Sequence, residues 1–268
     1  PYVRGRERSR KPEEIIAEIK RLVADGVVEI MLLGQNVNSY GKNLEEPMTF
    51  AQLLRKANQI EGLKRIRFMT SHPKDLSDEL IEVMASSKKI CRHLHLPLQS
   101  GSSEILKKMN RHYTKEQYLE LAERIRKAVP DISLTTDIIV GFPGETEEEF
   151  EASRNFVDSI DFYETHIFKY SRREGTKAAV MPDQVSEGKK SARSAEMIEM
   201  GEQKRRAYEE SFIGKEVEVL VEEEIERNGE IFWTGHTKEY IKIALQSREN
   251  LRNCIVKVQI EDALQIIH

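Results

Sequence analysis

Two apolar segments that each end abruptly in polar and glycine residues constrain this chain more than any other feature. The first is Leu94-His-Leu-Pro-Leu-Gln-Ser-Gly-Ser102, and the second is Asp137-Ile-Ile-Val-Gly-Phe-Pro-Gly-Glu145. In α/β proteins the parallel strands are buried, and ligands bind at their carboxyl ends. Two such endings in one alternating chain therefore indicate an enzyme site rather than a scaffold.

Strand-like and helix-like segments alternate through the first part of the chain. The predicted strands cover residues 27–33, 64–70, 91–98, 132–140 and 162–170. Helical patterns separate them. Thr49 suits the N-cap of one helix, and Thr114-Lys-Glu-Gln117 is a capping-box pattern before another. This order predicts parallel pairing, and both an open doubly wound sheet and a partial (β/α) barrel fit it.

The pattern changes after Thr176. Residues 186–210 read as a long charged helix, and from residue 211 the apolar residues recur at period two around an Asn228-Gly229 hairpin turn. We predict three parts: an α/β core at 1–184, a connecting helix at 185–210 and a small antiparallel β-barrel at 211–268. A barrel of this size is typical of nucleic-acid-binding modules.

Composition narrows the function classes. No run of eighteen apolar residues occurs, and the first residues lack the apolar region of a signal peptide, so we expect a cytoplasmic protein that enters no membrane. The two cysteines, Cys91 and Cys254, fit a reducing compartment and exclude an all-cysteine metal site within these 268 residues. Because the chain has no initiator Met, we expect a fragment or a processed product.

Basic residues crowd the start of a chain whose net charge is −4. This cluster either binds phosphate or forms a solvated end, and the charge run alone fits both. It comprises Arg4, Arg6, Arg8, Arg10 and Lys11. The segment Tyr170-Ser-Arg-Arg-Glu-Gly-Thr176 offers an aromatic face and two guanidinium groups, which suit a nucleobase and its phosphate or an ordinary surface loop.

Several polar residues follow predicted strands. His72 precedes a proline and is more typical of a structural hydrogen bond than of catalysis. His93 and His95 alternate along one strand, but the sequence supplies no third ligand, so we predict no metal site there. Asp137 lies among apolar neighbours and needs a partner, either a ligand hydroxyl or ammonium or an internal salt bridge. No Ser/His/Asp order, P-loop or dinucleotide fingerprint occurs, so these residues alone do not define the reaction.

Taken together, several segments resemble the radical S-adenosylmethionine (SAM) methylthiotransferases, most closely the MiaB-like group that modifies tRNA. The resemblance covers nearly the whole chain and rests on motifs in the family's order. They are Pro1-Tyr-Val-Arg-Gly-Arg-Glu-Arg-Ser-Arg10, Gly34-Gln-Asn-Val-Asn-Ser-Tyr-Gly41, the Leu94–Ser102 stretch, Met109-Asn-Arg111, Gly141-Phe-Pro-Gly-Glu-Thr146 and Tyr170–Thr176.

The resemblance implies a fold and cofactors. It implies a partial radical SAM (β/α) barrel followed by an RNA-binding β-barrel called TRAM, which agrees with the pattern at 211–268. In this family a Cys-x-x-x-Cys-x-x-Cys loop, placed just before the segment that matches Pro1, binds a [4Fe–4S] cluster that coordinates SAM, and a further N-terminal domain holds a second cluster. Cys91 and Cys254 match no ligand position, so we expect this chain alone not to reduce SAM.

The resemblance also implies site residues and partners. The SAM pocket would be lined by Gln35, Ser71, Gln99, Ser100, Asp137, Gly141 and Glu145, and tRNA would be approached by Arg4, Arg6, Arg8, Arg10 and Arg173. In the parent enzyme, the SAM-derived radical would act on C2 of adenosine 37 in the anticodon stem-loop. The implied electron donor is a flavodoxin or ferredoxin, and we expect a monomer.

The sequence leaves the choice of substrate divided. Residues 34–41 and 68–73 look like the isopentenyladenosine branch, which we favour, whereas residues 165–170 and 235–240 look like the threonylcarbamoyladenosine branch. A rival of another class is a non-catalytic tRNA-binding protein. Five carboxylates of the predicted barrel weaken that rival unless they face away from phosphate. They are Glu216, Glu218, Glu222, Glu223 and Glu224.

Overall fold

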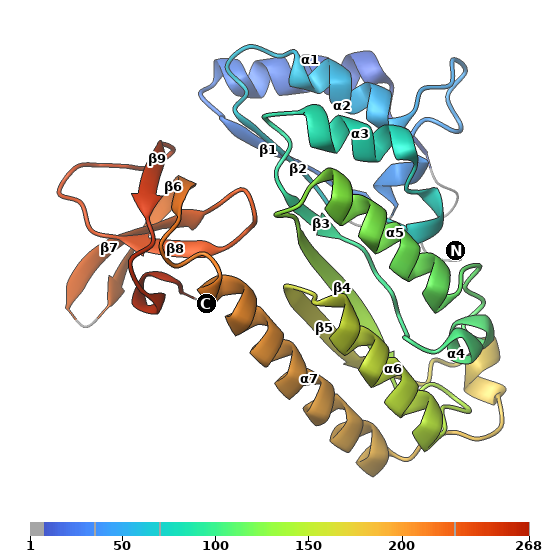
Figure 1. Cartoon of the computed structure of the whole chain (residues 1–268). Helices are drawn as coiled ribbons and strands as arrows, with labels where there is room; N and C mark the ends of the chain where they lie inside the picture. Colours follow the sequence, from blue (N-terminus) through green and yellow to red (C-terminus); the bar gives the residue numbers. More distant parts are fainter. Residues whose placement is uncertain (1–7, 35, 70, 228, 268) are drawn as a thin grey trace. The chain divides into compact units, whose positions relative to one another are not determined.

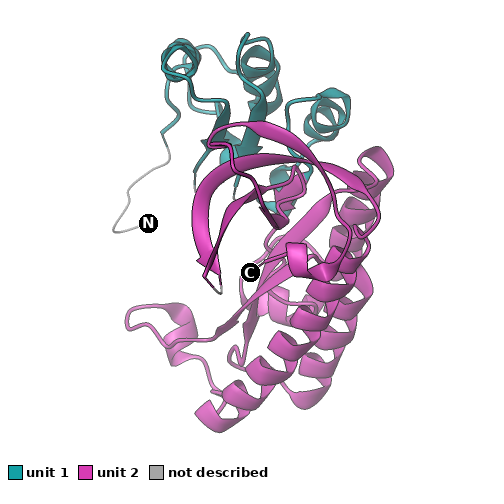
Figure 2. Ribbon diagram, turned by 90° about the vertical axis from the view of Figure 1, so that its left-hand side faces the viewer, with its two compact units in different colours: residues 1–92 teal, residues 93–268 magenta. Residues whose placement is uncertain are grey.

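The chain folds into two compact units, Pro1–Arg92 and His93–His268 (Figure 2). The computed structural model describes residues 8–34, 36–69, 71–227 and 229–267. No helix within these described ranges is long and apolar enough to cross a membrane.

The first unit is a parallel strand pair with helices. Its elements are α1 (Pro12–Ala24), β1 (Glu29–Leu32), α2 (Phe50–Asn58), β2 (Arg65–Phe68) and α3 (Asp78–Ser86), with short 3₁₀ turns at Val37–Ser39 and Pro73–Asp75. Strand β1 pairs with β2 in parallel from Glu29↔Arg65 to Leu32↔Phe68. The predicted N-cap is confirmed, because Thr49 and Gln52 form a capping box at the start of α2.

The second unit begins with a three-stranded parallel sheet, in the order β3-β4-β5. Its elements are β3 (His93–His95), α4 (Ser103–Lys108), α5 (Lys115–Ala128), β4 (Ser133–Val140), α6 (Glu147–Ile160) and β5 (Glu164–Lys169). Figure 1 shows β4 between its two neighbours. The predicted capping box at Thr114 and Gln117 is confirmed at the start of α5. Parallel pairing is also confirmed.

Strand β3 is shorter than the predicted strand at 91–98, for a local reason. Pro97 has no N–H to donate to the ladder, and the N–H of Leu98 donates to the Thr136 hydroxyl at 2.8 Å. Pairing resumes as an isolated bridge between Gln99 and Ile138. The apolar pattern predicted an extended chain correctly but not the interruption of its hydrogen bonds.

The two faces of this sheet differ in chemistry. On one face, the hydroxyls of Tyr118 in α5 and Thr136 in β4 both donate to the Leu96 carbonyl, at 2.7 and 2.9 Å. Helices α5 and α6 lie on that side (Figure 1). Thr135 and Asp137 alternate with Thr136 along β4 and therefore belong to the other face. The apolar core lies on the helix side, and polar groups gather on the opposite side.

A long helix and a curled antiparallel sheet complete the second unit. They are α7 (Glu187–Glu210), β6 (Glu216–Arg227), β7 (Glu230–His236), β8 (Lys242–Leu245) and β9 (Ile255–Gln259), with the strand order β8-β7-β6-β9. The predicted hairpin is confirmed, since β6 and β7 pair up to Arg227↔Glu230 and Gly229 has φ 81°. Asn228, the other predicted turn residue, lies outside the described residues.

The core of the antiparallel sheet reaches back to the parallel sheet. Trp233 and the inward residues of β6 pack with Tyr163, which directly precedes β5, and with Phe212, which follows α7. The inward set also includes Val217, Val219, Val221, Ile241, Ile243, Ile260 and Ile266. Close packing at Gly235 matters here, because a Cβ at this position would lie 1.9 Å from the Leu220 carbonyl oxygen.

We predict that Gly235→Ala destabilises the antiparallel sheet by about 1–3 kcal/mol or more, as overpacking against rigid backbone does. The measurement is urea unfolding followed by fluorescence of Trp233, the chain's single tryptophan, which is buried in this core. Gly188→Ala in α7 is the matched control, since a Cβ there meets nothing within 4 Å. Equal midpoints for the two variants would contradict the prediction.

Candidate functional site

The carboxyl ends of β3 and β4 meet at Gln99. Its N–H donates to the Asp137 carbonyl at 2.8 Å, and its carbonyl accepts from the N–H of Ile139 at 2.9 Å. Gln99 has φ 73°, a left-handed conformation that is uncommon for a residue other than glycine. Conformations of this kind are retained where the surroundings over-determine them, often at ligand sites. These backbone hydrogen bonds bring Gln99 and Asp137 together, and their role in one SAM site stays a prediction.

Ser100 and Gly101 are buried by contacts within the protein. The Ser100 hydroxyl accepts from the N–H of Ser102 at 3.2 Å, and the N–H of Gly101 donates to the Ser153 hydroxyl at 2.8 Å. A Cβ on Gly101 would lie 2.6 Å from the Ser153 carbonyl oxygen. Glycine at 101 thus allows α6 to approach the loop closely, which is a structural reason for a residue that the sequence associated with a ligand.

Asp137 has imidazole neighbours on the open face of the sheet. Its carboxylate lies 3.5 Å from His95 Nε2, and 27% of its side chain is exposed. In the register of β4 and β5, Asp137 is the direct partner of His166. The sequence left a ligand and an internal salt bridge open for this residue. The structure provides two histidines on neighbouring strands, neither of which is near Asp137 in sequence.

Glu145 is held by protein groups rather than left open to a ligand. Its carboxylate accepts from the N–H of Gly141 and from the Arg193 guanidinium, both at 2.7 Å. Only 1% of the Glu145 side chain and 5% of the Arg193 side chain are exposed. Burial raises the pKa of Glu145, and the Gly141 amide and Arg193 oppose that rise. This contact fastens the turn after β4 to α7.

In the first unit, side chains join the loops after β1 and β2. Asn36 donates to Asp75 at 2.7 Å, and its Oδ1 accepts from the N–H of His72 at 3.4 Å. Partial burial works to raise the pKa of Asp75, but hydrogen bonds from Lys42 and Asn36 outweigh it and lower that pKa. His72 Nδ1 accepts from the N–H of Lys74, which agrees with the structural reading of this histidine.

Two predicted cofactor residues belong to these loops. The Ser71 side chain is buried, and its hydroxyl has no hydrogen-bond partner among the described residues. An unpartnered buried hydroxyl is costly unless a ligand or water satisfies it, so Ser71 fits a ligand-binding role. Gln35 lies outside the described residues.

A cavity of about 700 Å³ lies beside β1 and includes Arg8, Arg10 and Gly34 among its lining residues. Arg8 is exposed, whereas Arg10 is paired with Glu18 at 2.6 Å. Arg4 and Arg6, predicted with them as tRNA contacts, lie outside the described residues. Arg173, in the loop after β5, is exposed.

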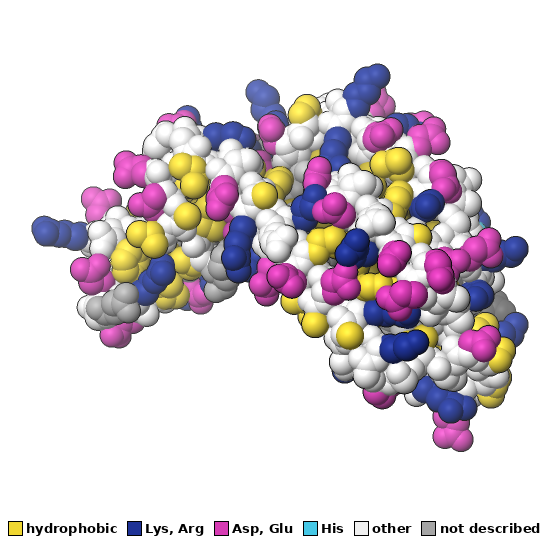
Figure 3. Space-filling view, turned by 60° about the horizontal axis from the view of Figure 1, so that its bottom comes forward, with side chains coloured by type: hydrophobic (Ala, Val, Ile, Leu, Met, Phe, Trp, Pro, Cys, Tyr) yellow, Lys and Arg dark blue, Asp and Glu magenta, His cyan; other side chains and the backbone are white. Residues whose placement is uncertain are grey.

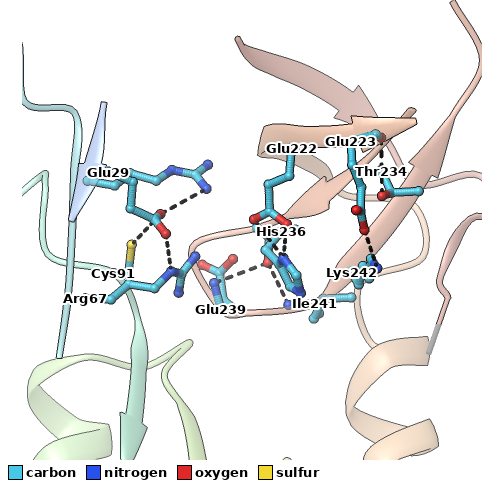
Figure 4. A network of polar contacts seen from close by, with 12 residues as sticks. Glu29, Arg67, Cys91, Glu222, Glu223, Thr234, His236, Glu239, Ile241 and Lys242 are labelled. Carbon is cyan, nitrogen blue, oxygen red and sulfur yellow. Dashed lines mark hydrogen bonds and ion pairs between the residues drawn. The ribbon is translucent and has the colours of Figure 1, made fainter. Parts of the chain in front are cut away.

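The two cysteines do not fit an iron–sulfur cluster. Cys91 is buried beside Glu29, which also binds Arg67 at 3.0 Å (Figure 4). Cys254 is exposed next to β9, in the other compact unit. A [4Fe–4S] cluster needs several thiolates around one point. These two residues supply no such set.

The fold agrees with comparisons to known proteins. The sequence model of the radical SAM superfamily matches residues 1–157, more than half of the chain, and the chain belongs to that superfamily. A coproporphyrinogen III oxidase from Escherichia coli has a TM-score of 0.53 at 16% identity, over 72% of this chain and 46% of its own. A radical SAM methyltransferase from Kitasatospora setae has a TM-score of 0.50 at 20% identity, over 61% and 32%. These two structures support the fold alone.

Among curated relatives, several carry the name tRNA-2-methylthio-N(6)-dimethylallyladenosine synthase. The one from Lachnoclostridium phytofermentans is 53% identical over 98% of this chain and 57% of its own length. Those from Caldicellulosiruptor saccharolyticus and Thermoanaerobacter sp. are 52% and 58% identical over 91% and 83% of this chain, and 52% and 47% of their own lengths. The chain thus spans about half the length of these relatives.

We predict that Arg193→Met destabilises the second unit by about 3–5 kcal/mol, because it leaves the buried Glu145 carboxylate without its cation. Removal of Arg193 raises the pKa of Glu145 further. The carboxyl is then neutral in the folded variant at low pH, so the deficit should shrink between about pH 7 and about pH 5. Urea unfolding followed by helical circular dichroism measures both effects.

Two further variants test this explanation. Arg154→Met removes an exposed ion pair with Glu196 and should cost about 0–1 kcal/mol. Adding Glu145→Gln to Arg193→Met should recover part of the loss and remove its pH dependence. A deficit that stays constant across this pH range would show that Glu145 is not its cause.

Proposed function

We propose that this chain is the radical SAM core and RNA-binding module of a tRNA methylthiotransferase that acts on N6-dimethylallyladenosine. The observation that carries the proposal is the 53% identity over 262 residues, which spans the parallel sheets, α7 and the antiparallel sheet. Identity over both compact units supports a shared activity better than a match to the superfamily core alone. The names of these relatives favour the isopentenyl (dimethylallyl) branch over the threonylcarbamoyl branch.

For the cofactor, we infer that SAM binds at the strand ends. The unpartnered hydroxyl of Ser71, the strained Gln99 and the neighbouring Asp137 support this assignment. Gln35, Ser100 and Gly141 complete the proposed set, and Glu145 positions the Gly141 turn through its hydrogen bond to the Gly141 amide. Bound together in the whole enzyme, SAM and a [4Fe–4S] cluster would supply a radical. The residues of this chain bind and orient the nucleoside.

For RNA, we infer that the antiparallel sheet and the loop at Arg173 contact tRNA. Three of the five carboxylates that argued against RNA binding pair with lysines, and a fourth contacts a histidine. Glu216 pairs with Lys257, Glu218 with Lys238, Glu222 with His236 and Glu223 with Lys242, at 2.8–3.4 Å. Figure 4 shows the pairs of Glu222 and Glu223, and Figure 3 shows basic and acidic side chains interspersed on one face. Such pairing reduces the repulsion of phosphate.

We also propose the tRNA region, the reductant, the cellular compartment and the oligomeric state. The tRNA region would be the anticodon stem-loop, the reductant a flavodoxin or ferredoxin, and the compartment the cytoplasm. The protein would act as a monomer. Arg8 and Arg10, with Arg4 and Arg6, would approach the tRNA backbone, although Arg10 must first give up its pair with Glu18.

Activity is tested in a hybrid in which this chain replaces the segment that it matches in the Lachnoclostridium relative. We expect the hybrid to restore 2-methylthio-N6-dimethylallyladenosine to the tRNA of a strain that lacks this modification. Mass spectrometry of digested tRNA is the measurement. The unaltered relative is the positive control.

Three results would oppose the proposal. The first is a folded hybrid that leaves N6-dimethylallyladenosine unmodified. The second is a hybrid that adds the methylthio group to threonylcarbamoyladenosine instead, which would reassign the substrate. The third is tRNA binding without modification by a hybrid that contains its clusters, which would favour the non-catalytic alternative.

Binding of tRNA is tested by charge reversal. Arg173→Glu should weaken tRNA binding and lower the slope of log affinity against log salt by about 1 for each phosphate that the variant no longer neutralises. The measurement is fluorescence anisotropy of labelled tRNA between about 50 and 200 mM salt. Lys127→Glu, an exposed charge reversal on α5, is the control and should leave the slope unchanged. Equally weakened binding in both variants would point to a non-specific effect of charge.

A further inference from the structure

Three potential metal ligands meet on the open face of the parallel sheet, one from each strand. They are His95 of β3, Asp137 of β4 and His166 of β5, and one ligand atom of each lies within 4.8 Å of the others. Asp137 and His166 are direct partners in the register of β4 and β5. His95 is paired with Thr135, two residues before Asp137 on the same face. The backbone of one sheet therefore fixes all three positions.

His95 is oriented as metal-binding histidines are. Its ring is buried, and its Nδ1 lies 2.9 Å from the Thr135 hydroxyl, which leaves Nε2 3.5 Å from Asp137 Oδ2. Metal ligands of this type almost always use the second ring nitrogen for such a hydrogen bond, which fixes the tautomer and the ring. Two ligands at about 2.0–2.1 Å from a tetrahedral ion lie about 3.3 Å apart. The His95–Asp137 distance is close to that separation.

The third ligand is the adjustable one. His166 is exposed, and its ring centroid lies 5.8 Å from that of His95. Its ligand nitrogen lies within 4.8 Å of the other two ligand atoms, and an exposed side chain changes rotamer readily. His93, the other histidine of β3, is engaged elsewhere, because its ring stacks on Tyr240 with a centroid distance of 4.7 Å. Of the two histidines in β3, His95 is therefore the candidate ligand, and His93 is a packing residue.

We propose that His95, Asp137 and His166 bind one divalent transition-metal ion of the Zn²⁺ or Fe²⁺ class. Two imidazoles and one carboxylate suit these ions, whereas Mg²⁺ and Ca²⁺ prefer ligand sets made entirely of oxygen. Because Asp137 is partly exposed and His166 exposed, coordination positions remain for water or a substrate oxygen. The site contains no thiolate. It shares Asp137 with the proposed SAM-binding set, so in a chain that holds this ion the Asp137 carboxylate binds the metal and the other residues of that set bind SAM.

The test is metal binding by the 268-residue chain in a Cys254→Ser background, which removes the exposed thiol. After chelator treatment, Zn²⁺ is titrated by calorimetry, and Co²⁺ is titrated by visible absorption. We expect one ion per chain and a cobalt spectrum without thiolate charge-transfer bands. Fe²⁺ is titrated under anaerobic conditions to separate the two members of the ion class.

Variants identify the ligands. His166→Gln and Asp137→Asn should each weaken Zn²⁺ binding at least about tenfold, and Thr135→Val should weaken it by about 10–100-fold through the orientation of His95. His112→Gln changes an exposed histidine outside the group and should have no effect. His166 is exposed, so its replacement leaves the fold intact even if Asp137→Asn does not.

Three outcomes would overturn the site. These are no binding of Zn²⁺, Co²⁺ or Fe²⁺, equal weakening in His166→Gln and His112→Gln, or thiolate bands in the cobalt spectrum. Because no step of this experiment requires SAM cleavage or tRNA, its failure would leave the proposed enzymatic function untouched. Failure of the hybrid enzyme would likewise leave the metal site standing.

Discussion

The pairing of strand β4 with both of its neighbours determines which side chains of the parallel sheet lie next to one another. This strand is hydrogen-bonded on both edges, to β3 and β5, and its side chains alternate between a helix-covered face and an open face. A shift of pairing by one residue would move Asp137 into the apolar core and Ile138 to the open face. The burial of Leu134, Ile138 and Val140 thus fixes the register, and that register places Asp137 beside the histidines of both neighbours.

The end of β4 also connects the parallel sheet to the rest of the second unit. Glu145 holds the turn at Gly141, and Arg193 holds Glu145 to α7. Helix α7 lies against β5, where a Cβ at Gly201 would meet the Thr165 hydroxyl at 2.2 Å. At its far end, the Tyr208 ring packs at a tilt against Tyr163 and Phe212, which belong to the core of the antiparallel sheet. A buried ion pair and an aromatic cluster therefore connect the proposed catalytic and RNA-binding parts.

Local rules predicted the elements well and the site only in part. The capping boxes at Thr49 and Thr114 depend on residues three positions apart, and the parallel order follows from the alternation of strands and helices. Contacts between distant residues were not predictable in this way. Arg193 is 48 residues from Glu145, and a search for a third ligand near His95 in sequence could not find His166, two strands away. The pairing of β4 with β5, which local sequence patterns do not show, brings His166 to Asp137, and the packing of α7 brings Arg193 to Glu145.

The antiparallel sheet contacts the amino ends of the parallel strands, whereas the residues proposed to bind SAM lie at the carboxyl ends. At the start of β3, His93 stacks on Tyr240, which stacks in turn on His236 of β7 at 4.5 Å. At the start of β4, the Ser133 hydroxyl donates to the Glu239 carbonyl at 2.6 Å. The amino ends of the strands thus carry the proposed RNA-binding sheet, and Gln99 and Gly141 lie at the carboxyl ends. His95 and Asp137 lie between, so an ion there would sit between the RNA-binding sheet and the strand ends proposed to bind SAM.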